Sequence, residues 1–178
     1  RPFPQRVNEE LTMHAVIVAG SSLTGELDAY LFDDADLVVA VDSGAEALSR
    51  VGLVPDILIG DMDSISAATR ETLEARGVEV VLLETVKDET DTEAALRLAV
   101  DRGADAVTVY GALGGPRLDH LVGNLFLLSS SWLAGVGVRM VDELHDAFLV
   151  SGDVVFGGRQ GDIVSLLPLP PEVENVRT

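Results

Sequence analysis

The stretch DLVVAVDSGAEALSRVGLVPDILIGD, residues 36–61, decides the fold class. It contains two short runs of Val, Ile and Leu at residues 36–42 and 56–61, separated by an amphipathic segment at 44–51 that predicts a helix. Gly52 stands where such a helix should end. Near-continuous apolar strands joined by helices are typical of parallel sheets that are covered on both faces. The stretch therefore predicts a strand–helix–strand unit of an α/β protein.

The same alternation continues on both sides of this unit. We expect further strands at residues 14–20, 78–84, 106–112 and 136–142, and further helices at 24–33, 66–76, 91–102 and 119–134. The pattern predicts an open, mostly parallel, Rossmann-like sheet with helices on both faces, formed by residues 14–143.

The two ends of the chain differ from this pattern. From residue 144 three short apolar runs follow one another with turns and no helix between them, so we expect residues 144–178 to begin an all-β sandwich domain. About thirty residues of hairpin cannot bury a core of their own, and we expect this domain to be incomplete. Residues 1–13 are expected to be an N-terminal arm, either disordered or added during cloning.

The composition excludes several classes of function. Twelve basic and thirty acidic side chains leave a formal net charge of −18, which disfavours nucleic acid and anionic membranes as partners. The absence of cysteine excludes disulfides, zinc thiolates and a cysteine nucleophile, and is compatible with the cytoplasm, where we expect the protein. No uninterrupted apolar stretch predicts a membrane span. No Walker A sequence or GxGxxG motif follows the first strand, which disfavours P-loop NTPases and dinucleotide oxidoreductases.

Carboxylates gather at the carboxyl ends of the predicted strands, where open parallel sheets bind ligands. The strand at 56–61 runs into Asp61 and Asp63, and Asp88 and Asp91 follow the strand at 78–84. Four carboxylates without imidazole or thiolate nearby make an all-oxygen set that suits Mg²⁺. Each residue also has a structural explanation, because aspartates form turns and complement helix dipoles. Taken alone, Asp61 and Asp63 fit a turn slightly better than a metal site.

Two details of local structure accompany these carboxylates. Met62 is expected to point away from Asp61 and Asp63 into the packing, because successive side chains alternate on an extended chain, and Ser64 is expected to start the next helix. Thr90 and Glu93 match a helix-capping box.

Two further strand ends face the same edge of the predicted sheet. Asp42 ends the strand at 36–42, and the strand at 106–112 leads into Gly114, Gly115, Arg117 and Asp119. A glycine pair alone suits a plain loop, but a glycine turn followed by an arginine and a helix N-terminus offers donors to an anion. Together with Mg²⁺, these groups are the parts needed to bind and polarise a polyphosphate.

Four motifs on these strand ends resemble the thiamine pyrophosphokinase family: VDSGAEAL (41–48), VPDILIGDMDS (54–64), KDETDTEAAL (87–96) and GALGGPRLDHLVGNL (111–125). The resemblance implies an α/β catalytic domain followed by a β-sandwich, in a homodimer that binds thiamine between the two kinds of domain. It also implies transfer of a pyrophosphoryl group from ATP to the hydroxyethyl oxygen of thiamine, which gives thiamine diphosphate and AMP.

The resemblance assigns roles to individual residues. Asp61, Asp63 and Asp91 match the Mg²⁺ ligands, and Asp88, the candidate proton acceptor, would complete the catalytic set. The residues that would bind ATP are Asp42, Lys87, Gly114, Gly115, Arg117 and Asp119. Three positions depart from the family pattern: Ser43 and Glu46 replace a glycine and an asparagine, and Pro116 is inserted before Arg117.

The acidic edge leaves two other classes of function open. A Mg²⁺-dependent phosphohydrolase or small-molecule kinase would use the same groups, and a nucleotide-sensing module would bind without turnover. The nucleotide product distinguishes a pyrophosphokinase from an ordinary kinase, because pyrophosphoryl transfer releases AMP and a kinase releases ADP.

Overall fold

The chain forms two compact units. One consists of residues 1–9 and 150–178, and the other of residues 10–149. The structure is a computed structural model, and the residues that it describes are 5–6, 13–20, 27, 29–86, 88–169, 173–174 and 176.

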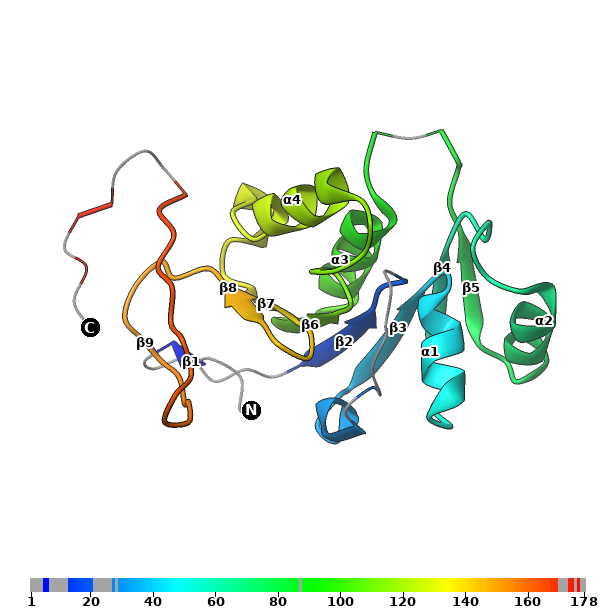
Figure 1. The fold of residues 1–178 in the computed structure, drawn as a ribbon. Helices are drawn as coiled ribbons and strands as arrows, with labels where there is room; N and C mark the ends of the chain where they lie inside the picture. The colour runs from blue at the N-terminus through cyan, green and yellow to red at the C-terminus, as the bar shows by residue number, and fades with distance from the viewer. Residues whose placement is uncertain are drawn as a thin grey trace. The chain divides into compact units, whose positions relative to one another are not determined.

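A seven-stranded sheet organises the larger unit (Figure 1), with strand order β5-β4-β3-β2-β6-β7-β8. The strands are β2 (His14–Val18), β3 (Leu37–Val41), β4 (Ile57–Gly60), β5 (Glu79–Leu82), β6 (Ala106–Tyr110), β7 (Gly137–Val141) and β8 (Asp146–Phe148). Neighbouring strands are parallel except β7 and β8, which are antiparallel. The predicted open, mostly parallel α/β sheet is confirmed.

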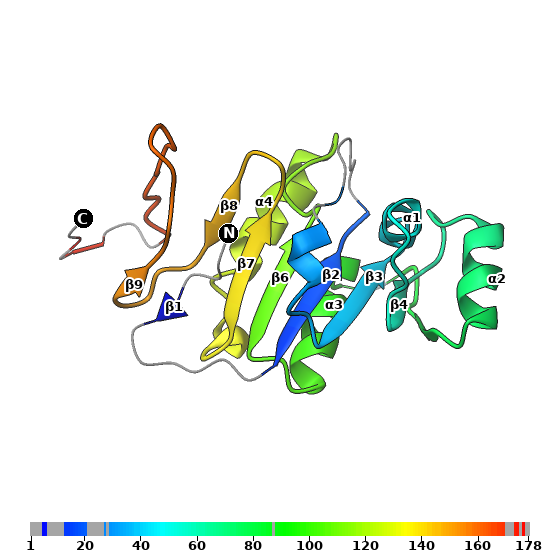
Figure 2. The same ribbon diagram turned by 90° about the horizontal axis from the view of Figure 1, so that it is seen from below.

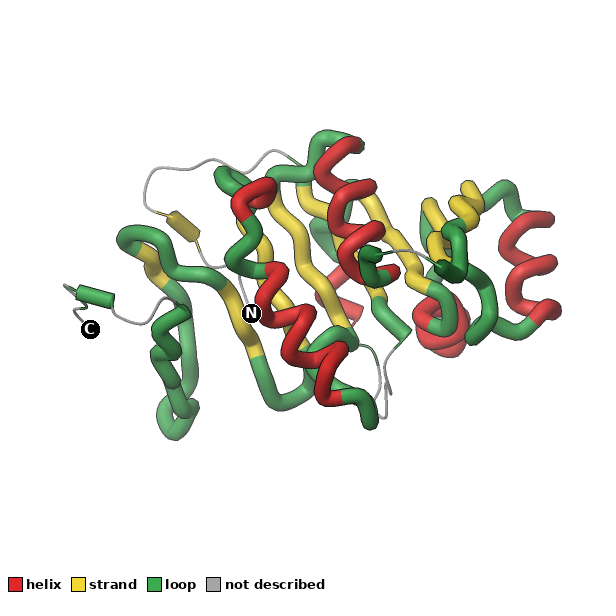
Figure 3. Tube along the Cα trace, turned by 90° about the horizontal axis from the view of Figure 1, so that it is seen from above, coloured by secondary structure: helices red, strands yellow, loops and turns green. Residues whose placement is uncertain are grey.

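Helices cover both faces of this sheet (Figures 2 and 3). α3 (Asp91–Asp101) and α4 (Leu118–Leu127) lie on one face, and α1 (Gly44–Arg50), α2 (Ala67–Ala75) and the 3-10 helix η1 (Ala29–Phe32) lie on the other. Of the helix expected at 24–33, residues 24–26 and 28 lie outside the described residues, and the described part forms the 3-10 helix η1 over Ala29–Phe32, which is shorter than predicted. Within the described segments, the structure contains no helix of sufficient length and apolarity to span a bilayer.

The helix expected at 119–134 is shorter than predicted. α4 ends at Leu127, and a separate 3-10 helix, η2 (Ser131–Leu133), follows. The hydroxyl of Ser129 donates to the carbonyl of Phe126 (2.8 Å). Because serine side chains compete for backbone hydrogen bonds, the run of three serines after Leu128 ends the helix in spite of its apolar surroundings.

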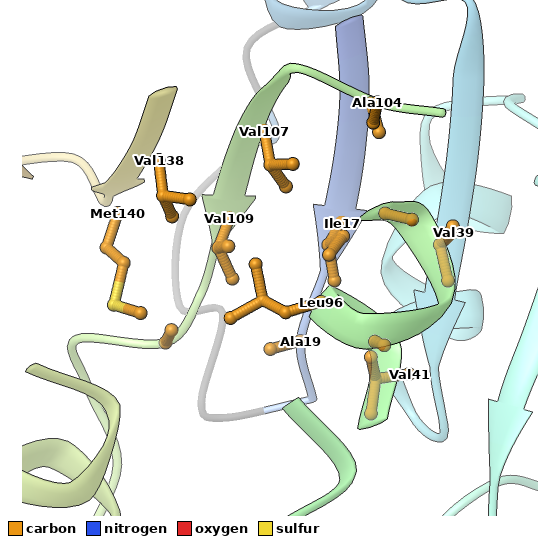
Figure 4. Packing of buried hydrophobic residues seen from close by; sticks show 14 of the residues in the cluster. Ile17, Ala19, Val39, Val41, Leu96, Ala104, Val107, Val109, Val138 and Met140 are labelled. Atoms are coloured by element: carbon orange, nitrogen blue, oxygen red, sulfur yellow. The ribbon is translucent and has the colours of Figure 1, made fainter. Parts of the chain in front are cut away.

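Two apolar layers hold the sheet and helices together. Leu96 of α3 lies among Ile17, Ala19 and Val109 of the sheet in the first layer (Figure 4). Leu48 of α1 belongs to the second layer, on the opposite face. Successive apolar side chains of β2, β3 and β4 alternate between the two layers, which is why these strands read as continuous apolar runs.

Three aspartates fix the amino edge of the sheet. Asp36, Asp56 and Asp105 each directly precede a strand. Their carboxylates accept backbone N–H groups from the start of a neighbouring strand: His14 donates to Asp36 (2.8 Å), Val38 to Asp56 (2.8 Å) and Met13 to Asp105 (3.0 Å). These bonds satisfy amides that the strand ladder leaves without a partner, and they fix the strand register.

The edge strand β8 is a difference from the sequence expectation. The pattern assigned residues 146–148 to the β-sandwich, but this strand pairs with β7 in the α/β sheet. Arg139 of β7 and Asp146 of β8 form a buried ion pair (2.7 Å). Arg139 is buried and Asp146 is partly buried, so the pairing of the two strands gives each of these charges a partner of opposite sign.

The smaller unit contains one antiparallel strand pair, β1 (Gln5–Arg6) with β9 (Val154–Val155). Gln5 and Arg6 fall in the segment that was expected to be an arm. Residues 156–169 form neither helix nor strand, and Ile163 and Leu167 among them are exposed. The all-β sandwich and the domain boundaries at 13/14 and 143/144 stay predictions.

Replacement of Leu96 tests the first apolar layer. Leu96 is 0% exposed, whereas Leu118 on α4 is 72% exposed. Leu96→Ala should lower the free energy of unfolding by about 3 kcal/mol, because it leaves a cavity under the sheet. Leu118→Ala, the matched control, should change it by less than about 0.5 kcal/mol. Urea denaturation followed by circular dichroism measures both, and equal effects would contradict the assigned packing.

Candidate active site

The site begins with Asp42, the residue that follows β3. Its backbone adopts the left-handed conformation, with φ 45°, and its N–H donates to the carbonyl of Ile59 in β4 (3.0 Å). The residue is only 6% exposed. One of its carboxylate oxygens accepts the backbone N–H of Met62 (3.0 Å), so the Asp42 side chain holds the turn that follows β4.

Gly60 makes this contact possible. It ends β4 with φ 152°, and a Cβ atom at this position would overlap the carboxylate of Asp42. A side chain at residue 60 would therefore push Asp42 away from the turn. Sequence analysis singled out the aspartates of this motif but not the glycine before them.

The turn brings Asp61 and Asp63 to Asp42. Each of these three aspartates offers a carboxylate oxygen, and the three oxygens lie within 4.8 Å of one another. The N–H of Asp63 also donates to the carboxylate of Asp61 (3.1 Å). Asp42, which sequence analysis assigned to ATP, is thus part of the same acidic group as Asp61 and Asp63, whereas Asp91 is not among these three.

Burial and electrostatic repulsion both act on this acidic group. Burial raises the pKa of Asp42 to about 6, the Met62 N–H opposes the rise, and the charges of Asp91, Asp61 and Asp63 add to it. The pKa of Asp63 is also raised, chiefly by the adjacent charge of Asp61 and then by their hydrogen bond, with a contribution from Asp91. Asp91 therefore lies close enough to act on this group. A cation is the partner that would relieve the repulsion.

The local structure of the turn differs from the extended chain that was predicted. Met62 has φ 65°, so strand alternation does not apply to it. Its side chain nevertheless packs against the second apolar layer, as expected. The prediction that Ser64 starts the next helix is wrong: Ser66 is the N-cap of α2, and its hydroxyl accepts the N–H of Thr69 (3.2 Å).

Glu46, one of the departures from the family pattern, also contacts this turn. It lies in α1, four residues after Asp42, and its carboxylate accepts the N–H of Ser66 (2.9 Å). Sequence analysis treated Glu46 only as a departure. A contact between residues twenty positions apart, made through one backbone amide, leaves no signal in the sequence pattern.

The β5–α3 loop carries the second pair of predicted acids. Asp91 is the first residue of α3, and the side chain of the preceding Thr90 accepts the N–H of Glu93 (3.1 Å), which confirms the Thr90 half of the predicted capping box. The carboxylate of Glu93 accepts a bond from Arg97 (2.8 Å). Asp88 is exposed in the bend before the cap, and Lys87 lies outside the described residues.

The β6–α4 loop carries the glycine pair and the arginine. Gly114 is half-buried, and Gly115 is exposed with φ 94°, a conformation that favours glycine. Arg117 directly precedes α4 and pairs with Asp119 (2.5 Å), both side chains being exposed. This pair raises the pKa of Arg117 and lowers that of Asp119. Asp119 therefore neutralises the cation that was predicted to contact ATP.

Asn124 is a functional candidate that sequence analysis missed. It is the buried residue of α4, and its side-chain amide donates to the carbonyl of Ala112 at the start of the loop (2.9 Å). This bond joins the two ends of the segment that contains Gly114 and Arg117. A polar residue within an apolar helix was the available signal, because a buried amide needs a partner.

Residues 29–139, which include the acidic turn and both of these loops, match the family model described as "Thiamin pyrophosphokinase, catalytic domain". The chain belongs to the thiamin pyrophosphokinase family. The thiamine pyrophosphokinase of Bacillus subtilis is 33% identical over 129 residues, which are 71% of this chain and 59% of that protein.

Solved structures of family members have the same fold. The crystal structure of thiamine pyrophosphokinase from Bacillus subtilis superposes with a TM-score of 0.63 at 32% identity, over 73% of this chain and 61% of that one. That of thiamin pyrophosphokinase from Geobacillus thermodenitrificans gives 0.61 at 36% identity, over 73% and 60%. The chain thus spans about three fifths of the length of these relatives.

Gly60→Ala tests the contact between Gly60 and Asp42. The added Cβ collides with the carboxylate, and we expect the free energy of unfolding to fall by about 3 kcal/mol. Gly52→Ala is the matched control, because Gly52 has φ 78° but open space around a Cβ, so it should cost about 1 kcal/mol. Thermal denaturation compares the two, and a Gly60→Ala variant as stable as Gly52→Ala would refute the collision.

Asp42 should also make stability depend on pH in the metal-free protein. Its folded pKa of about 6 exceeds the ordinary value of 3.8, so the folded state holds the proton more tightly. The resulting stability is present below about pH 4 and is lost as pH rises through about 6, a change of roughly 3 kcal/mol. Asp42→Asn lacks this dependence but keeps an acceptor for Met62.

Urea denaturation of both proteins at a series of pH values measures the effect. The stability of Asp42→Asn relative to the unmodified protein should increase between about pH 4 and pH 7. Parallel curves for the two proteins would contradict the raised pKa.

Proposed function

We propose that the protein is a thiamine pyrophosphokinase, which transfers a pyrophosphoryl group from ATP to the hydroxyethyl oxygen of thiamine and releases AMP. The observation that carries the proposal is the acidic group of Asp42, Asp61 and Asp63 at the carboxyl edge of the sheet, in a chain of this family. Open α/β sheets bind ligands at that edge.

Mg²⁺ is the metal that fits this site. The donors are carboxylate oxygens with no imidazole or thiolate among them. Burial is the chief cause of the raised pKa of Asp42, and the charge of Asp61 is the chief cause of the raised pKa of Asp63. A cation would oppose both effects. Asp61 and Asp63 would hold the ion, together with Asp42 or Asp91. When bound, it would neutralise phosphate oxygens of ATP and polarise the group to be transferred.

The glycine loop would bind the phosphates of ATP. Gly114 and Gly115 allow backbone N–H groups to approach an anion, and the N-terminus of α4 adds further donors. Arg117 would exchange its bond to Asp119 for a bond to a phosphate oxygen, which an exposed pair allows at little cost. Lys87 is proposed to add a second cation.

The reaction itself is proposed to be an in-line displacement. A bond forms between the hydroxyl oxygen of thiamine and the β-phosphorus of ATP, the bond from that phosphorus to the oxygen bridging to the α-phosphorus breaks, and AMP leaves. The hydroxyl proton must be removed, and Asp88, whose side chain is exposed in its loop, is the proposed acceptor. The protein mainly aligns the reactants and compensates charge.

The remaining parts of the proposal follow the family resemblance. Thiamine would bind against a β-sandwich that begins in the smaller unit, in a cytoplasmic homodimer. The net charge of −18 disfavours nucleic acid as a partner.

Release of AMP is the test of this function. The intact protein, mixed with ATP, Mg²⁺ and thiamine, should form AMP and thiamine diphosphate in equal amounts, as measured by chromatography. ADP in place of AMP would identify a kinase, and nucleotide cleavage without thiamine would identify a hydrolase; either result would refute the proposal. Asp61→Asn should lower the rate by about 100-fold or more. Asp101→Asn, at the exposed end of α3, is the control and should leave it unchanged.

A further inference from the structure

We infer that Glu46 is a positioning residue for the metal-binding turn, an inference that rests on the proposed function. The turn between β4 and α2 carries Asp61 and Asp63. Its first half is attached to Asp42 through the N–H of Met62 (3.0 Å). Its second half is attached to Glu46 through the N–H of Ser66 (2.9 Å).

Both attachments come from the same short segment. Asp42 lies just before Ser43, the N-cap of α1, and Glu46 lies in the first turn of that helix. The two carboxylates thus come from residues only four apart in the chain. They accept backbone N–H groups on either side of Asp63, that of Met62 and that of Ser66.

The bond from Ser66 to Glu46 replaces a missing local interaction. In a capping box, the side chain three residues after the N-cap accepts the N–H of the N-cap residue. In α2 that position is Thr69, which instead exchanges bonds with the Ser66 hydroxyl. Glu46 of another helix accepts the N–H of Ser66 in its place, and α2 thereby becomes anchored to α1.

This arrangement has a consequence for the metal site. Without Glu46, the end of the turn would depend on the cap of α2 alone, and the chain between Met62 and Ser66 would gain freedom. Asp63 lies within that segment. Loss of a residue that orients a metal ligand typically weakens metal binding by about 10- to 100-fold. We expect the loss of Glu46 to weaken it by about 10-fold, because Glu46 acts through the backbone.

Three variants of the intact protein distinguish how Glu46 could affect metal affinity: through its hydrogen bond, through its charge, or through the cap of α2. Glu46→Ala removes the acceptor. Glu46→Gln keeps an acceptor oxygen and removes the charge. Ser66→Ala keeps the N–H that bonds to Glu46 and removes the hydroxyl that caps α2, so it serves as the matched control for a frayed helix.

Two measurements follow the contact and its effect without relying on activity. Amide exchange of Ser66, observed by NMR, should be about 10-fold faster in Glu46→Ala and unchanged in Glu46→Gln. Calorimetry with Mn²⁺ as the probe should give binding about 10-fold weaker for Glu46→Ala, and near-normal binding for Glu46→Gln and Ser66→Ala.

Three outcomes would overturn the inference. Normal Mn²⁺ affinity in Glu46→Ala would remove the positioning role. Equal loss in Glu46→Gln would show that Glu46 acts by its charge, and equal loss in Ser66→Ala would show that the helix cap is responsible. Failure of the proposed function would look different, because the unmodified protein would then release no AMP while Mn²⁺ binding still depended on Glu46.

Discussion

The contact between the Asp42 carboxylate and the turn after β4 is the constraint on which the rest of the site depends. It places a buried acid at the end of one strand against the backbone at the end of the next, and it needs a glycine at residue 60 to do so. Asp61 and Asp63 reach Asp42 only because this turn is held in the left-handed conformation at Met62. The geometry of the three acids is therefore a property of the fold and exists before any ligand binds.

Such an arrangement opposes the stability of the domain. Three carboxylates share one small region and a fourth, Asp91, acts on them through space. The apolar layers on both faces of the sheet provide the stability that makes this repulsion tolerable. Binding sites for cations are commonly built in this way, because repulsion in the empty site becomes attraction when the ion enters.

The sequence predicted the architecture well because the apolar runs are long and regular. All six parallel strands were located within two residues at each end, since parallel strands buried on both faces leave a continuous signal. The end of α4 was misplaced because three serines overrode an apolar pattern. The strand β8 was assigned to the wrong sheet. The apolar pattern of a strand predicts which of its faces is buried, but it does not predict which strand it pairs with.

The candidate site was predicted in its membership more than in its geometry. The strand-end pattern and the resemblance named Asp42, Asp61, Asp63, Asp91 and the glycine loop, whose roles stay predictions. Neither placed Asp42 beside Asp61 and Asp63, because only the fold brings them together. Gly60 was missed because its role is to leave room for the carboxylate of Asp42, which comes from another strand end. Glu46 and Asn124 were missed because each bonds to a backbone atom of another element, and such a contact does not constrain the partner's side chain.

The aspartates at the amino edge of the sheet make different contacts from those at its carboxyl edge. Asp36, Asp56 and Asp105 each bond across to a neighbouring strand, whereas Asp42, Asp61 and Asp63 converge on one another. At the amino edge, backbone N–H groups at the start of one strand reach the carboxylate that precedes the next. At the carboxyl edge, Asp42 and Asp61 each accept one backbone N–H from the turn after β4 and still lie close to Asp63. The direction of the strands thus separates aspartates that bridge neighbouring strands from aspartates that lie close to one another.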